Sequence, residues 1–222
     1  MGLSVRSEYS SLFAVGLILS QEIRGTFTKG SEICRGPLLA KCQYLRACID
    51  ESLRVSPPLP STLWRQLAPD DGGSHPLVVD GHVIPKGIVV GVSIYSLHHN
   101  PEYFPEPFKF MPERWLQPSD TESEYSRASF RTARDAFASD SVGPRSCPGK
   151  AMAYSEISLR VGKDVLLGEI GAGSKGAGLG RERPDEYQLF DINSAAHDGP
   201  YLAFQPRGDF CCEELGVENR KR

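Results

Sequence analysis

The chain has 222 residues, of which 40% are hydrophobic and 24% are charged, with 22 glycines and 17 prolines. This composition excludes coiled-coil and collagen-like proteins and indicates a globular chain of one or two domains with much irregular backbone. The formal net charge is -3, from 25 basic and 28 acidic residues, and gives no electrostatic indication of a nucleic-acid partner.

Hydropathy and cysteine usage suggest the compartment. The longest apolar run, residues 12–19, is far shorter than the ~20 residues of a membrane-spanning helix. It has no basic flank and cleavage site, so we expect neither a transmembrane segment nor a signal peptide. The six cysteines are Cys34, Cys42, Cys48, Cys147, Cys211 and Cys212. Because none has C-x-x-C spacing, we expect no disulfide framework or zinc site, and a reducing compartment.

Three segments are predicted to be helical. In residues 12–27 apolar side chains recur at every fourth position, as on one face of an amphipathic helix. A second pattern covers residues 41–55 and stops before Pro57 and Pro58, because proline lacks the backbone donor that a helix needs. A third helix is predicted for residues 149–165.

Short strands are predicted between and after these helices. Residues 77–80 and 88–92 are rich in β-branched side chains, and the Pro-Lys-Gly of residues 85–87 lies between them. This pattern predicts a hairpin, or two nearby strands, turning at residues 85–87. Further short strands are expected within residues 187–192 and 201–204.

The remaining segments predict irregular structure. Residues 100–115 combine four prolines with five aromatic residues, which predicts an ordered, aromatic-packed coil. Residues 117–140 are polar and predict a surface loop or a short helix. The glycine-rich residues 168–180 predict a flexible insertion or linker.

The loop at residues 141–150 has the strongest indication of chemistry. It contains glycine and proline, opens a helix, and carries Cys147 at the helix mouth. Unpaired backbone donors and the helix dipole favour a thiolate at such a position. This thiolate could be a metal ligand or a nucleophile, although the loop has no histidine to act as a base. A buried structural cysteine is the third possibility.

The same loop resembles the haem-binding signature of cytochromes P450, F-x-x-G-x-R-x-C-x-G, with matches at Gly143, Arg145, Cys147 and Gly149. The resemblance implies that Cys147 is the axial ligand of haem b, iron protoporphyrin IX. Asp140 departs from the pattern, because it stands where the family has an aromatic residue.

The Asp140 departure has two implications. A carboxylate at this position would disfavour a neighbouring thiolate. Residues 138–140 read as an insertion that displaces Phe137 from the aromatic position.

Two further motifs follow the order of the P450 family. Residues 51–54, Glu-Ser-Leu-Arg, resemble the E-x-x-R motif of the K helix, and residues 112–115, Pro-Glu-Arg-Trp, resemble the PERF/PERW segment. The resemblance implies that Glu51, Arg54 and Arg114 form a buried network behind the haem, with a structural role rather than a catalytic one.

A third stretch resembles the region before the family's meander. In that register Arg65 is the residue that meets a haem propionate, and Arg145 is a second candidate, since a guanidinium matches a carboxylate in charge and geometry. His98 either approaches a propionate or is a surface histidine. The matching residues are 63–65, 83–87 and 97–101.

The resemblance covers residues 17–160 and 190–207 and corresponds to the C-terminal part of a P450. It implies an α+β fold, mainly α, with J-, K- and L-type helices, a small β sheet, a meander and the cysteine-ligand loop. We expect four parts: a partial haem-binding region at 1–167, a glycine-rich insertion or linker at 168–185, C-terminal P450 strands at 186–207, and a charged tail at 208–222.

By this resemblance the chain is a haem-thiolate monooxygenase of fungal secondary-metabolism type, which oxidises a small organic molecule with electrons from NADPH through cytochrome P450 reductase. The I-helix pattern A-G-x-[DE]-T occurs nowhere in the chain, so no catalytic residue is identified. The alternative is an inactive, truncated remnant without the I helix and the substrate half. The chain as it stands would be cytoplasmic, whereas a longer anchored form would lie at the endoplasmic reticulum membrane.

A competing motif is G-x-G-x-x-G at residues 171–176, with Asp191 beyond it. A dinucleotide site needs a helix directly after the glycines to hold the pyrophosphate. Here more glycines follow, so a Rossmann site is disfavoured.

Overall fold

The structure is a computed structural model that describes residues 4–66, 76–119, 121, 123–172, 189–190, 196–197 and 202–206. For residues 4–13, and from residue 168 onward, it describes the backbone alone. Several expectations therefore fall outside the described residues: most of the linker at 168–185, the G-x-G-x-x-G residues from 173 onward, and the tail at 208–222 with Cys211 and Cys212.

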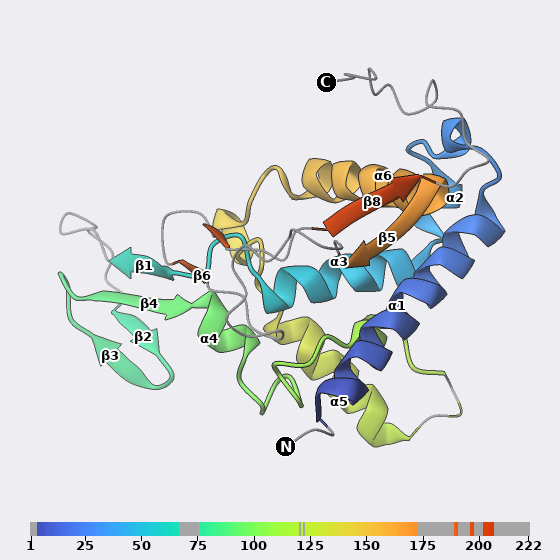
Figure 1. The fold of residues 1–222 in the computed structure, drawn as a ribbon. Coiled ribbons are helices and arrows are strands. Elements are labelled where there is room, and N and C mark those ends of the chain that lie inside the picture. Colours follow the sequence, from blue (N-terminus) through green and yellow to red (C-terminus); the bar gives the residue numbers. More distant parts are fainter. Residues whose placement is uncertain are drawn as a thin grey trace.

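Helix α3 (Gln43–Val55) lies at the centre of the fold. It packs against α1 (Ser4–Thr26), α6 (Lys150–Leu167), the short helix α4 (Ile94–His98) and the 3-10 turn η2 (Pro112–Trp115) (Figure 1). A four-residue helix, α2 (Pro37–Ala40), precedes α3. The three long helices predicted from the sequence are confirmed, and α1 begins earlier than its apolar pattern.

Helices α1, α3 and α6 bury a common apolar core. Ile23 and Phe27 of the first helical segment are almost completely buried, at the four-residue spacing that predicted the helix. The core of these helices includes Leu19, Ile23, Phe27, Leu45, Ile49, Tyr154, Val165 and Leu166. Each helix is amphipathic and hides its apolar face against the other two, so the helix carrying the cysteine loop is fixed relative to α3.

A second, smaller core lies on the other side of α3. Residues 100–115 form the expected coil except for η2, and Phe104 within it is fully buried. Helix α5 (Glu124–Ala136), 13 residues long, occupies the segment predicted as a loop or short helix, and the Ser123 hydroxyl caps it by accepting the Ser126 N–H at 3.2 Å. Ala47, Phe104, Trp115 and Ala133 pack together there.

Four strands in the middle of the chain form two antiparallel pairs. Strand β1 (Thr62–Gln66) pairs with β4 (Val89–Ser93), and β2 (Leu77–Val79) pairs with β3 (His82–Ile84). They project from one side of the helical core (Figure 1).

The predicted hairpin between residues 77–80 and 88–92 is wrong. The hairpin turns at Asp80 and Gly81, whose φ angles of 48° and 77° are those of a type I′ turn, so β2 pairs with β3. Residues 85–87 do form a turn, closed by the Ile88 N–H on the Pro85 carbonyl at 3.2 Å, but this turn leads into β4, which pairs with β1 instead.

Two strand pairs complete the described part. Strand β5 (Gly168–Ala172) pairs antiparallel with β8 (Leu202–Pro206), and β6 (Leu189–Phe190) with β7 (Ala196–His197). The strands expected within 187–192 and 201–204 are thus present. The first five residues of the predicted glycine-rich linker belong to β5.

A polar contact joins α6 to α3 within the core. The Tyr154 hydroxyl donates to the buried Asp50 carboxylate at 2.7 Å, and burial together with this bond raises the pKa of Tyr154. Arg46 donates to the same carboxylate at 3.2 Å and places its guanidinium 3.7 Å from the centre of the Tyr154 ring. No helix of the described ranges is both long and apolar enough to cross a membrane.

The Tyr154 contact predicts a stability difference. Tyr154→Phe keeps the ring but removes a donor from a buried carboxylate, so the free energy of unfolding should fall by about 1–3 kcal/mol, as measured by urea denaturation. The exposed Tyr125 provides the control, and Tyr125→Phe should change stability by less than about 0.5 kcal/mol. Equal effects of the two substitutions would contradict the assignment.

Candidate functional site

The cysteine loop, residues 141–150, follows α5 and leads into α6. Cys147 is an exposed free thiol three residues before the first residue of α6. Its N–H donates to the Asp140 carbonyl at 2.8 Å, and its own carbonyl accepts the Lys150 N–H at 3.3 Å. The alternative of a buried structural cysteine is therefore wrong. The thiol is exposed just before the N-terminus of α6.

Glycines have different parts in this loop. Gly143 begins the 3-10 turn η3 (Gly143–Arg145) with a φ of 72°, a left-handed conformation that favours glycine. A Cβ at Gly149 would contact the Cys147 sulfur at 3.7 Å, which is an ordinary distance. The structure explains the glycine at 143 but shows no steric need for the one at 149.

Asp140, the departure from the signature, lies against the loop with its charge paired. Its side chain is 13% exposed, and its Oδ2 accepts from the Ser139 hydroxyl at 3.1 Å and lies 3.5 Å from the Lys150 Nζ. The Lys150 charge offsets the repulsion that this carboxylate would exert on a thiolate. Phe137, which we expected to be displaced, packs on Trp115 with ring centres 4.7 Å apart.

The two arginines predicted for propionates are both accessible. Arg145 ends η3, and Arg65 lies on β1 with its Nη1 donating to the Trp64 carbonyl at 2.9 Å. Neither guanidinium is paired with a carboxylate in the described part of the chain. An exposed thiol together with two exposed, unpaired guanidinium groups is a donor set that fits a haem with anionic propionates.

His98 is placed differently from the predictions. It is fully buried, so a surface histidine is wrong. Its Nδ1 lies 3.2 Å from the Arg54 carbonyl and its Nε2 lies 3.0 Å from the Ala138 N–H. These partners assign the neutral tautomer with the proton on Nδ1. Both ring nitrogens are engaged by backbone, so neither is free for a propionate in this structure.

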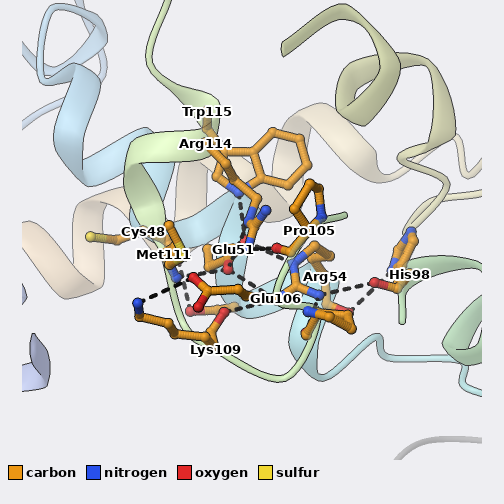
Figure 2. A network of polar contacts seen from close by, with 12 residues as sticks. Cys48, Glu51, Arg54, His98, Pro105, Glu106, Lys109, Met111, Arg114 and Trp115 are labelled. Atoms are coloured by element: carbon orange, nitrogen blue, oxygen red, sulfur yellow. Dashed lines mark hydrogen bonds and ion pairs between the residues drawn. The ribbon is translucent and has the colours of Figure 1, made fainter. Parts of the chain in front are cut away.

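The E-x-x-R and PERW residues meet at one buried carboxylate (Figure 2). Glu51 has no solvent exposure and accepts five N–H bonds. Arg54 donates twice, at 2.9 and 3.0 Å, and Arg114 donates through Nε at 3.2 Å. The Met111 N–H and the Trp115 indole N–H complete the set at 2.8 and 2.9 Å. Burying a carboxylate is costly, and these donors offset that cost.

Arg54 is satisfied as completely as Glu51. It uses all five guanidinium N–H groups, two toward Glu51 and three toward the carbonyls of His98, Pro107 and Lys109, at 2.6–3.2 Å. Arg54 therefore holds the coil of residues 100–115 against α3.

Sequence reasoning missed three members of this arrangement. Trp115 and Met111 were not expected to bind Glu51, and the signal available for Trp115 was its place in the PERW motif. The inward position of His98 could have been inferred from the buried Ile94, which lies four residues earlier on α4.

A cavity of about 390 Å³ lies elsewhere, between α5 and the segment around η2. Its lining includes Pro105, Glu113, Tyr125 and Phe130, and none of Cys147, Arg65 or Arg145. It is therefore separate from the cysteine loop.

Comparison with known proteins agrees with the motifs. The family model for cytochrome P450 matches residues 18–163, well over half of the chain. The chain belongs to the cytochrome P450 family. The mainly helical fold with small antiparallel sheets is consistent with part of a P450.

Similar P450 monooxygenases come from fungi. The chain is 42% identical to cytochrome P450 monooxygenase AKT7 of Alternaria alternata, over 84% of this chain and 37% of the relative. It is 42% identical to apf8 of Gibberella fujikuroi, over 85% and 50%, and 41% identical to atnE of Emericella nidulans, over 84% and 34%. The chain spans a third to a half of the length of these relatives.

The Arg54 contacts predict a large effect of a conservative change. Arg54→Lys offers three donors where five are used, so buried oxygens lose their partners and the free energy of unfolding should fall by about 3–5 kcal/mol. Arg160, exposed and paired with Asp164, is the matched control. Arg160→Lys should stay within about 0.5 kcal/mol in the same urea titration. A small loss at Arg54 would show that its bonds are dispensable.

His98 predicts a pH dependence of stability. Burial, the largest cause, lowers the pKa of His98 from 6.5 to about 4. Between these values the unfolded chain binds a proton that the folded chain does not. The stabilisation is complete above pH 6.5 and lost as the pH falls toward 4, by up to about 3 kcal/mol.

Urea unfolding of the wild type and of His98→Gln across this pH range measures the contribution. The variant should lose less stability on acidification than the wild type. His99, whose pKa burial also lowers, remains in both proteins and cancels in the comparison. Parallel pH profiles for the two proteins would contradict the assignment.

Proposed function

We propose that this chain carries the haem-thiolate centre of a P450 monooxygenase, with Cys147 as the axial ligand and Arg65 and Arg145 as partners of the propionates. The observation that carries the proposal is the exposed thiol of Cys147, presented at the mouth of α6 by the signature loop. The match of the family model to residues 18–163, which include this loop, supports it.

The chain's own residues would hold and orient the cofactor. Cys147 would provide the sulfur ligand, and Lys150 pairs with the Asp140 carboxylate beside the loop. Arg65 and Arg145 supply cationic forks that suit carboxylates. Glu51 and Arg54 keep the supporting backbone in place without touching substrate. Haem b, when bound, supplies the oxygen-activating chemistry.

In this role the protein would oxidise a small organic molecule in fungal secondary metabolism. Electrons would come from NADPH through cytochrome P450 reductase. The similar proteins are named P450 monooxygenases, and the proposal assigns the same activity to this protein.

An absorption spectrum tests the cofactor site. Purified protein supplemented with haem, reduced and treated with carbon monoxide should show the red-shifted Soret band of thiolate ligation, and Cys147→Ala should abolish it. Cys34 is a second exposed free thiol, so Cys34→Ala is the matched control and should keep the band. A spectrum of free haem alone for the wild type would contradict the proposal and favour an inactive remnant.

A further inference from the structure

His98 connects the buried ion network to the segment that leads into the cysteine loop. On one side its backbone carbonyl accepts from Arg54 Nη1 at 2.9 Å, and its Nδ1–H donates back to the Arg54 carbonyl at 3.2 Å. On the other side its Nε2 accepts the Ala138 N–H at 3.0 Å. The fully buried His98 side chain therefore bridges Arg54 and Ala138, and Ala138 lies 40 residues after His98 in sequence.

The Ala138 end of this bridge leads directly to Cys147. The Ala138 carbonyl accepts the Ser141 N–H at 2.9 Å, which closes a turn over residues 138–141. Within that turn the Asp140 carbonyl accepts the Cys147 N–H at 2.8 Å. The imidazole of His98 is therefore connected to Cys147 through the turn at residues 138–141 and the hydrogen bond between Asp140 and Cys147.

We infer that His98 is a positioning residue for Cys147, holding the turn at residues 138–141 against the Glu51–Arg54 network so that the thiol keeps its place at the mouth of α6. The inference deepens the proposed function and rests on it only in the last step, the ligation of haem by Cys147. The hydrogen-bonded connection itself stands in the protein alone.

A packing role for His98 is the competing explanation. Its ring stacks on Phe137 with centres 5.3 Å apart and meets Phe104 edge-on at 5.8 Å. If packing were all, any smaller polar side chain at this position would have the same effect on the loop. The Nε2 bond to Ala138 distinguishes the two explanations, because a variant can keep or lose it separately.

Substitution of His98 by glutamine or by asparagine distinguishes the hydrogen bond from the packing. A glutamine amide can reach the position of Nε2 and accept from the Ala138 N–H, whereas an asparagine amide reaches only the position of Nδ1, near the Arg54 carbonyl. Both replacements lose the aromatic ring. His99 is the matched control, since its Nδ1 bonds only to the Tyr95 carbonyl within its own helical turn, at 2.9 Å.

Amide hydrogen exchange of the full chain without added haem gives the first readout. In His98→Asn the Ala138 and Cys147 amides should exchange roughly fivefold to tenfold faster than in the wild type, as expected for the loss of one hydrogen bond. In His98→Gln, and in His99→Asn and His99→Gln, they should exchange at nearly the wild-type rate. Equal acceleration in His98→Asn and His98→Gln would overturn the inference in favour of packing.

The carbon monoxide spectrum of the haem-supplemented protein gives the second readout. His98→Asn should lose part of the red-shifted thiolate band that His98→Gln retains. If the wild type has no such band, the proposed function fails while the exchange data still decide the connection. If the wild type has the band and His98→Asn keeps all of it despite faster exchange, His98 does not position the ligand, and the inference fails.

Discussion

The structure depends on one buried negative charge. Glu51 lies at the centre of the fold with no solvent exposure, and its carboxylate is offset by two arginines, an indole and a backbone N–H. An unpaired carboxylate in such a place would cost several kcal/mol, so the groups that satisfy it cannot leave independently. The coil of residues 100–115 depends on these bonds for its position, because its only regular secondary structure is the 3-10 turn η2.

Helix α3, which carries Glu51, is also connected to both sides of the cysteine loop. Asp50, the neighbour of Glu51 on α3, binds Tyr154 and fixes α6, the helix that begins just after the loop. Arg54 binds His98, which holds Ala138 just before the loop. Asp50 and Arg54, four residues apart on α3, thus constrain both ends of the segment that carries Cys147. In the proposed role as a haem ligand, Cys147 would depend on this support, because its own loop is exposed.

Sequence reasoning succeeded where the physical cause is local. The apolar period of residues 12–27 and 41–55 predicted two helices that form the core, and the cysteine at a helix mouth was found exposed. One local signal indicates the correct hairpin, since Asp80 and Gly81 have the Asp-Gly pattern of a type I′ turn, and the prediction of a turn at residues 85–87 overlooks it. The other failure has a tertiary cause. Nothing local to His98 shows which backbone groups its two nitrogens will meet, so these two hydrogen bonds could not be predicted from the sequence.

Native-state hydrogen exchange of the wild-type chain tests most directly whether the buried charge and the cysteine loop form one unit. The amide of Met111 binds Glu51, and the amides of Ala138 and Cys147 lie at the other end of the connection. With increasing denaturant the opening free energies of these three amides should merge into one value, as in a single cooperative unit. An opening that exposes Cys147 and Ala138 at low free energy while Met111 stays protected would show that the loop is held independently of Glu51.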